Sequence, residues 1–289
     1  MGAADVVPGV SGGTMAFILG IYTQLIDAIK SFDATWLVAV VKFDLRTSFT
    51  RPHFLFLLPL GLGIICAALF FTRVVPVPSL LHSHPEAIYG LFFGLIVGST
   101  IILLRDIESK SLIDFFAILA GIILGAVIVT AVPTQTPDNW WVIMGCGALA
   151  ICAMVLPGIS GSFILLILGK YATVLDGIGK FDVAIILPFA LGAAAGLSAF
   201  TRLLSWLMHR YERVMLLLIS GFLVASLWVI WPFQHRQYVM VRGEQRLLES
   251  VPMLPTWESS TVHAVLLAVL GLLLVISVSH IASRRSQFR

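Results

Sequence analysis

Charged residues are scarce in this chain, and that scarcity excludes an ordinary soluble domain. Only 11% of the 289 residues are Asp, Glu, Lys or Arg, whereas about a quarter is usual in soluble globular proteins. The apolar segments run for about 17–23 residues without strict alternation, which is typical of membrane-spanning helices. The predicted fold class is therefore an all-α polytopic membrane protein.

The sequence also lacks the patterns expected of disulfides, metal sites, nucleic-acid binding and a cleavable signal peptide. The three cysteines, Cys66, Cys146 and Cys152, lie in apolar stretches, which predicts small buried side chains and not a disulfide or metal set. No metal-ligand spacing is found, and no cofactor is predicted. The net charge of +3 comes from loop arginines and indicates no nucleic-acid partner. No basic segment, apolar core and cleavage site open the chain, so we expect no cleavable signal peptide.

The sequence does contain a helix-breaking motif that occurs twice. Pro-Gly-Val-Ser-Gly-Gly-Thr at Pro8–Thr14 returns 149 positions later as Pro-Gly-Ile-Ser-Gly-Ser-Phe at Pro157–Phe163. Both copies lie in apolar sequence, where proline and glycine are poor choices for a continuous helix. Breaks of this kind in a hydrophobic protein indicate a binding site where the backbone unwinds.

The similarity extends beyond the motif. Pro8–Asp33 and Pro157–Asp182 share 12 of 26 residues without a gap, and Leu58–Arg73 matches Leu187–Arg202 at 7 of 16 positions. Shared membrane composition would not align proline, glycine, tyrosine and a Phe-Thr-Arg triplet in order. The pattern predicts a duplication, with about 20 extra residues near 34–53 in the first copy.

We expect one membrane domain made of two halves, residues 1–133 and 134–289, each with a re-entrant helical hairpin and three spans. The hairpin tips lie at the motifs, and the glycine-rich segments Gly61–Gly63 and Gly192–Gly196 are expected to pack closely against other helices. A polar loop is expected at Pro232–Ser260. We predict about six spanning helices, at Phe54–Thr72, Glu86–Leu104, Leu112–Val132, Ala184–Met208, Val214–Trp231 and Val262–Ile281.

The crossing count predicts an inverted-topology repeat. A re-entrant hairpin returns to its own side, so three spans separate the two hairpins and they enter from opposite faces. With this topology one side carries 12 Lys and Arg residues and the other carries 6, which places both termini in the cytoplasm. Trp140–Leu156 leads into the second motif, whereas only Met1–Val7 precede the first, so we expect the first half to lack a leading helix.

The motif tips are candidates for an anion site. A helix that begins inside the membrane offers unpaired N–H groups and the positive end of its dipole, and phosphate and carboxylate bind naturally there. Glycines allow close approach of a ligand, and hydroxyls add donors. The alternative is a helix kink in which serine satisfies the backbone. The candidate residues are Ser11, Gly12, Gly13, Thr14, Ser160, Gly161 and Ser162.

Charged residues near the matched segments are further candidates. Arg73 and Arg202 end the two Phe-Thr-Arg triplets and either draw a phosphate toward the tips or extend to lipid headgroups. Asp27 and Asp176 are also matched, and they either serve coupling to an ion or pair with Lys30 and Lys180. The remaining acidic candidates for coupling are Asp5 and Glu86.

The chain resembles the bacterial polyprenyl-phosphate transporter family over essentially its whole length. The segments that carry the resemblance are Val-Val-Pro-Gly-Val-Ser-Gly-Gly-Thr, the following Leu-Gly-Ile-Tyr, and Leu-Pro-Gly-Ile-Ser-Gly-Ser. The resemblance implies a flippase, not an enzyme, that returns undecaprenyl phosphate from the outer to the inner leaflet of the bacterial cytoplasmic membrane for cell-wall (peptidoglycan) synthesis. The implied partners are this lipid phosphate and membrane lipids, and a homo-oligomer is left open.

Two other functions stay open on the residues alone. A membrane phosphatase acting on undecaprenyl pyrophosphate would need an arginine within the loop and several carboxylates nearby; the loops have Gly12-Gly13 and Gly161-Ser162 instead, with only Asp5 near a tip. A transporter of a small soluble anion could use the same tips, and it would have a closed, water-filled vestibule in place of lateral openings.

Overall fold

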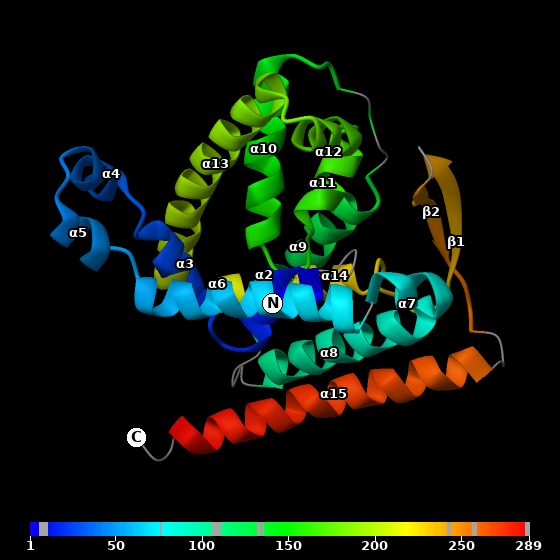
Figure 1. Cartoon of the computed structure of the whole chain (residues 1–289). Coiled ribbons are helices and arrows are strands. Elements are labelled where there is room, and N and C mark those ends of the chain that lie inside the picture. Colours follow the sequence, from blue (N-terminus) through cyan, green and yellow to red (C-terminus); the bar gives the residue numbers. More distant parts are fainter. Residues whose placement is uncertain are drawn as a thin grey trace.

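The computed structural model of the chain describes residues 1–5, 11–75, 77–105, 111–131, 134, 136–241, 244–255 and 259–286. Packed helices form the body of the molecule, and a two-stranded β-hairpin lies at one edge (Figure 1). The elements are α1 (Gly2–Asp5), α2 (Gly12–Ile18), α3 (Tyr22–Lys30), α4 (Ala34–Val41), α5 (Leu45–Thr50), α6 (Phe54–Leu69), the π-helix η1 (Phe70–Val74), α7 (Val77–Ser83), α8 (Pro85–Arg105), α9 (Leu112–Val129), α10 (Trp140–Val155), α11 (Gly161–Ile167), α12 (Tyr171–Gly179), α13 (Val183–Arg210), α14 (Glu212–Ser226), β1 (Gln234–Val241), β2 (Glu244–Pro252) and α15 (Ser259–Ser286).

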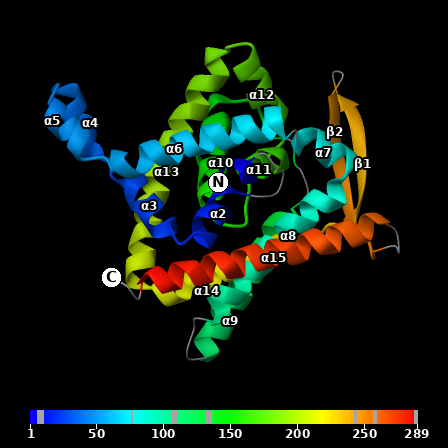
Figure 2. The ribbon, with the colours of Figure 1, turned by 60° about the horizontal axis from the view of Figure 1, so that its bottom comes forward.

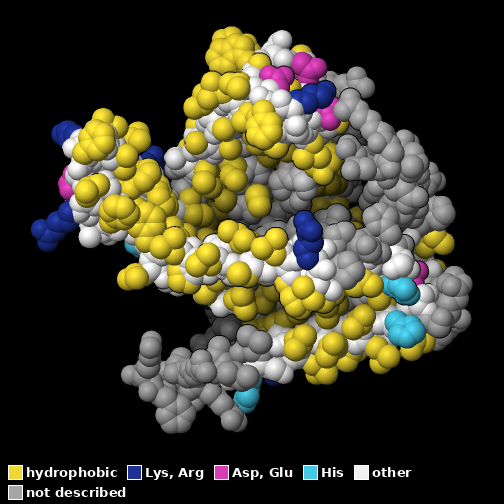
Figure 3. All heavy atoms as spheres, in the orientation of Figure 1, with side chains coloured by type: hydrophobic (Ala, Val, Ile, Leu, Met, Phe, Trp, Pro, Cys, Tyr) yellow, Lys and Arg dark blue, Asp and Glu magenta, His cyan; other side chains and the backbone are white. Residues whose placement is uncertain are grey.

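Five helical segments are long and apolar enough to cross a membrane, and the count reaches six if the bent pair α11–α12 is one span. This confirms the predicted all-α polytopic class. The segments are Phe54–Val74, α8, α9, α13 and Ser260–Ser277 of α15. The span predicted at Val214–Trp231 is shorter than expected, because α14 ends at Ser226 after 15 residues, which is about 22 Å of helix. Apolar side chains cover the flanks of the molecule, and charged ones gather at helix ends and on the α4–α5 projection (Figure 3).

The two copies of the repeat fold alike around the motif. α2 and α11 each have seven residues, α3 and α12 each have nine, and both pairs begin 149 positions apart. The chain bends between them at Gly20 and Gly169, which have φ of 68° and 66°. At both bends the glycine N–H and the next N–H donate back into the last helical turn, a glycine-terminated helix end. α2–α3 and α11–α12 are therefore each a pair of separate helices, and the chain bends by 113° between α11 and α12.

The second matched block also has the same helix start in both copies. α6 begins at Phe54 and α13 at Val183, which are 129 positions apart, and each contains an internal proline. The extra residues of the first copy form α4 and α5, which project sideways from the body in both views (Figures 1 and 2).

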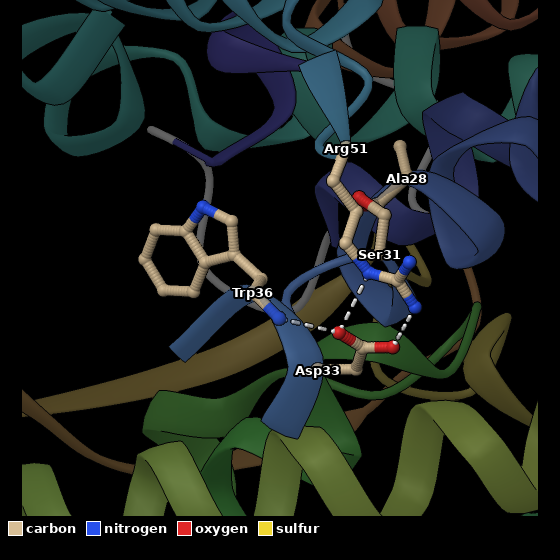
Figure 4. A network of polar contacts seen from close by, with 5 residues as sticks. All are labelled: Ala28, Ser31, Asp33, Trp36 and Arg51. Carbon is tan, nitrogen blue, oxygen red and sulfur yellow. Dashed lines mark hydrogen bonds and ion pairs between the residues drawn. The ribbon is translucent and has the colours of Figure 1, made fainter. Parts of the chain in front are cut away.

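A polar network holds the α4–α5 projection together (Figure 4). Asp33 caps α4 by accepting from the Trp36 backbone N–H at 2.9 Å, and its two oxygens accept from Arg51 Nε and Nη2 at 2.9 and 2.5 Å. The Arg51 guanidinium, followed by the Trp36 backbone N–H, holds the pKa of the Asp33 carboxyl well below its usual range. Trp36 Nε1 donates to the Ser48 carbonyl at 3.1 Å, so the apolar segment folds as a small helical hairpin.

The two halves exchange partners along their middle and last spans. α8 of the first half packs on α15 of the second, and α9 of the first half packs on α14 of the second. Glycines make both approaches close: a methyl group added at Gly94 would lie 1.8 Å from the Ala268 carbonyl oxygen, and one at Gly221 would lie 2.4 Å from that of Ile118. Two helices from residues 1–133 thus pack crosswise on two helices from residues 134–289.

The first long helices of the two halves differ in their surroundings. α10 and α13 stand side by side, upright in Figure 1, whereas α6, α8 and α15 run across beneath them. A methyl group at Gly192 of α13 would lie 1.8 Å from the Met144 carbonyl oxygen of α10. Its counterpart Gly63 in α6 has nothing within 4 Å among the described residues, and neither has Gly61. Close packing was thus correctly predicted for Gly192–Gly196 and is not found for Gly61–Gly63.

The segment predicted as a polar loop, Pro232–Ser260, contains β1 and β2. They pair antiparallel, with Gln234 opposite Pro252 and Val241 opposite Glu244. The run Tyr238-Val239-Met240-Val241 is rich in residues that favour strands, so the sequence carried a strand signal beneath its polar composition.

The unequal surroundings of Gly192 and Gly63 give a matched test of the packing. Gly192→Ala should lower the free energy of unfolding by about 1–3 kcal/mol, because the new methyl group forces α13 away from α10. Gly63→Ala should leave it unchanged or raise it by up to about 1 kcal/mol, because the methyl group meets no neighbour and alanine favours a helix over glycine. Unfolding of the purified chain in mixed micelles would measure both. An equal loss in the two variants would contradict the open surroundings of Gly63.

Candidate functional site

The two motifs contact each other directly. The Thr14 hydroxyl oxygen of the first motif accepts a 2.8 Å hydrogen bond from the Gly158 backbone N–H of the second. The Ser11 hydroxyl donates to the Met154 carbonyl at 3.2 Å, at the end of the helix that leads into the second motif. Residues about 145 positions apart thus meet where α2 begins and α10 ends. The tip residues Pro8, Gly9 and Val10 lie outside the described part of the chain.

The first motif caps the end of α10. Helix ends leave their last carbonyls without intrahelical partners, and at α10 these are satisfied from the first half. The Ser11 hydroxyl donates to the Met154 carbonyl, and the Tyr22 hydroxyl donates to the Val155 carbonyl at 3.2 Å. A methyl group on Gly13 would lie 2.8 Å from the Val155 oxygen, so only glycine lets α2 approach this closely. The positive end of α2 therefore faces the negative end of α10.

The second motif is held by a backbone turn. Pro157 is fully buried, and Gly158 has φ of 88°, a left-handed conformation that favours glycine. A methyl group at Gly158 would lie 2.9 Å from the Phe222 carbonyl oxygen of α14. The turn is thus enclosed between α2 on one side and α14 on the other.

The hydroxyls of the two motifs face different surroundings. Ser11 and Thr14 are only 3% and 1% exposed, and both are engaged in the contacts between the halves. Ser11 also accepts from the Gly13 N–H at 3.1 Å and so caps α2. Ser160 makes no such cap on α11. Its hydroxyl lies 2.8 Å from that of Ser162 at the surface.

The start of α11 is the more open of the two helix starts. Gly161 is buried against α10, where a methyl group would lie 2.6 Å from the Ala150 carbonyl oxygen. Within the described residues, no acceptor is assigned to the backbone N–H groups of Gly161, Ser162 and Phe163. By contrast, Gly12 at the start of α2 is buried and already has an interaction partner. The arrangement of α11 suits an anion, because N–H groups and two hydroxyls are close together.

The two matched arginines lie at the surface. Arg73 in η1 and Arg202 in α13 are exposed, and neither forms an ion pair with a described residue. The adjoining threonines bond within their own helices, Thr72 to the Ala68 carbonyl and Thr201 to the Leu197 carbonyl. No hydrogen bond or ion pair between described residues joins either arginine to the motif serines. Both guanidinium groups are therefore available to bind an anion or a headgroup.

The acidic candidates occupy separate places. Asp27 accepts from the Ser205 hydroxyl at 3.0 Å, and the same hydroxyl accepts from Lys30 Nζ at 3.0 Å, so Asp27 and Lys30 are linked through α13. Asp176 also has an interaction partner. One Glu86 oxygen is buried and has no hydrogen-bond partner among the described residues. The side chain of Asp5 lies outside the described residues.

A buried lysine at the bend after α11 was not predicted from the sequence. Lys170 is 2% exposed and follows the bend between α11 and α12. Its ammonium group donates to the Thr136 carbonyl at 2.6 Å and pairs with Asp138. Its counterpart in the repeat is Ile21, so the alignment of the two copies gave no signal. Lys170 therefore holds residues 136–138, which precede α10, against the bend between α11 and α12.

Comparison with known proteins identifies the chain's relatives. A family model described as undecaprenyl phosphate translocase-like matches residues 1–248. A polyprenyl-phosphate transporter of Vibrio cholerae serotype O1 is 40% identical over 254 residues, which cover 88% of this chain and 81% of that protein. A polyprenyl-phosphate transporter of Staphylococcus aureus is 32% identical over 261 residues, which cover 83% of this chain and 86% of that protein. No solved structure matches the chain.

The different surroundings of the motif hydroxyls predict different consequences of removing them. Thr14→Val should lower the free energy of unfolding by about 1–3 kcal/mol, because the Gly158 N–H is left buried and unpaired. Ser162→Ala should change it by less than about 0.5 kcal/mol and should weaken phosphate binding instead. Unfolding and binding measured on the same purified samples would separate the two roles. A stable Thr14→Val variant would show that the contact between motifs does not hold the halves together.

Proposed function

The chain belongs to the undecaprenyl phosphate translocase-like family, and from that premise we propose that it moves undecaprenyl phosphate from the outer to the inner leaflet of the bacterial cytoplasmic membrane. The family match over residues 1–248 is the observation that carries the proposal. Both reported relatives bear the name of a transporter and neither that of an enzyme. Return of this lipid carrier would serve peptidoglycan synthesis.

We propose that the halves 1–133 and 134–289 are inverted repeats with re-entrant hairpins. Three features support this: the matched bounds of α2–α3 and α11–α12, the contact between the two motifs, and the crosswise pairing of α8 with α15 and α9 with α14. A pair of interrupted helices at a repeat interface is the common plan of binding sites in secondary transporters. Movement of one half against the other would then expose the site alternately, with both termini in the cytoplasm.

The phosphate head is proposed to bind where the motifs meet. The start of α11 supplies the hydroxyls of Ser160 and Ser162 and the N–H groups of Gly161 and Ser162. Ser11, Gly12, Gly13 and Thr14 contribute from the first motif, chiefly by fixing the Gly158 turn and completing the wall. A phosphate in apolar surroundings costs several kcal/mol unless donors replace its water, and these donors would do so.

Arg73 and Arg202 are proposed to bring the phosphate to that place. They are equivalent under the repeat, exposed, and not paired with a carboxylate of the described chain. One arginine on each side of the membrane would attract the doubly charged head on entry and on exit. Among the acidic candidates for coupling, Glu86 is favoured by its buried, unpartnered oxygen, because such a group is costly unless it is neutral or finds a partner.

Reconstitution into lipid vesicles tests this function against its alternatives. The purified chain should speed the movement of undecaprenyl phosphate between leaflets, release no phosphate from undecaprenyl pyrophosphate, and admit no inorganic phosphate into the lumen. Release of phosphate would support a phosphatase, and uptake of inorganic phosphate would support a transporter of soluble anions. Either result without lipid movement would overturn the proposal.

The arginines give the sharpest test at the level of residues. Arg73→Ala and Arg202→Ala should each slow lipid movement by roughly tenfold to a hundredfold, the loss of a charge-assisted hydrogen bond. Lysine should restore only part of the rate, because a point charge lacks the two-pronged match of guanidinium to phosphate. Arg46→Ala, an exposed change in α5, is the control and should leave the rate unaltered. Full activity in both alanine variants would reduce these arginines to contacts with headgroups.

A further inference from the structure

The place where Thr14 of the first motif contacts Gly158 of the second is called the motif junction below. Two apolar cavities lie next to each other beyond it. The larger, of about 760 Å³, lies between α9, α14 and the segment after β2. The smaller, of about 280 Å³, lies between α8, α15 and the start of the hairpin segment. Phe93 and Trp231 line both cavities, so the two spaces share one wall.

The shared wall is rigidly built. The Trp231 indole N–H donates to the Met253 carbonyl at 2.9 Å, and the Met253 N–H donates to the Phe233 carbonyl at 2.8 Å. The Trp231 ring also meets Phe93 and Phe233 edge to face, at 5.4 and 5.7 Å between centroids. A hydrogen bond and two ring contacts thus fix an aromatic partition between the cavities.

The lining selects an apolar ligand. Among the residues that the structure describes, no charged side chain lines either cavity. Apart from indole nitrogens, the one polar side-chain group in this described lining is the Thr130 hydroxyl, which already donates to the Ala126 carbonyl at 2.7 Å. A polar molecule would lose its hydration here without gaining partners. The space is also larger than packing defects in protein interiors and falls in the range of ligand pockets, about 300–1,000 Å³.

The larger cavity opens to the surface and lies close to the motif junction. Trp228 and Leu254 on its rim are 59% and 87% exposed, so a long chain could enter from the side. The Phe222 carbonyl lies against the Gly158 turn, and the cavity is lined by α14 and its extension from Val224 to Trp228. At 1.5 Å per helical residue, the turn and the cavity are within about 10 Å along this segment.

We propose that these cavities hold the first part of the polyprenyl tail while the phosphate head lies at the motif junction. The inference rests on the proposed function, which supplies a ligand with a charged head and a long apolar tail. The branched isoprenoid chain suits a groove divided by flat aromatic rings, and burial of its methyl and methylene groups would add affinity in proportion to the area covered. The remaining tail would extend past Trp228 into the bilayer. The structure thus assigns the recognition of the tail to α8, α9, α14 and α15.

Two filling variants and a matched control test the tail site. Ala126→Phe and Val224→Phe place a ring in the larger cavity from its two walls, and Ala195→Phe places the same ring on the exposed face of α13. Each purified full-length variant is titrated with undecaprenyl phosphate and with dimethylallyl phosphate, which has the same head and too short a tail to reach the cavity. We expect both filling variants to bind undecaprenyl phosphate about tenfold more weakly, the equivalent of about two buried methylene groups. Their affinity for dimethylallyl phosphate should stay within about twofold of the unaltered chain, since the head site is intact.

The outcomes separate this inference from the proposed function. If the unaltered chain binds undecaprenyl phosphate and both filling variants bind it equally well, the tail site is wrong and the function stands. If the unaltered chain does not bind the lipid, both are wrong. An equal loss in Ala195→Phe would show a general effect of the ring and would also overturn the tail site.

A second measurement needs no variant. Undecaprenyl phosphate with a photoreactive group on an early isoprene unit should label peptides from 122–130 and 224–231 of the unaltered chain. Labelling confined to α6 or α13 would overturn the tail site, because those helices line neither cavity.

Discussion

The backbone groups freed where two helices are interrupted must find partners away from water, and the rest of the structure depends on how they do so. Buried N–H and carbonyl groups without partners each cost on the order of a few kcal/mol. Here the first half supplies partners to the second: Thr14 accepts from the Gly158 N–H, and Ser11 and Tyr22 donate to the last carbonyls of α10. A helix break that would weaken a single half instead joins the two.

Because only the first half provides these partners, two similar motifs become unequal. The first motif has the second glycine at Gly13, which lets α2 approach the α10 carbonyls, and its hydroxyls are buried. The second motif has Ser162 at the corresponding position, and its paired hydroxyls face outward. The first motif therefore builds the contact between the motifs, and the second is the one we propose to bind the phosphate. In our proposal, the apolar cavities beyond α14 hold the tail and the polar start of α11 holds the head.

Features that follow from residue patterns, such as matched helices and spans, were predictable from the sequence. Features that depend on contacts between distant residues were not. The repeat predicted equal helices at matched positions, because the same glycine and proline positions impose the same breaks. Phe54–Thr72 and Leu112–Val132 were recognisable as spans from uninterrupted apolar length. The burial of Thr14 and the outward position of Ser162 were not predictable, since they depend on which half approaches the other. Lys170 had no signal, because its partners at Thr136 and Asp138 are brought near only by the bend at Gly169.

The most direct test is the position of the phosphate in an experimental structure of the chain with undecaprenyl phosphate bound in a lipid bilayer disc. The account predicts phosphate density within hydrogen-bonding distance of the Ser160 and Ser162 hydroxyls, with the Thr14 to Gly158 contact kept and the tail directed along α14. A phosphate held elsewhere, with the start of α11 covered by protein, would contradict it.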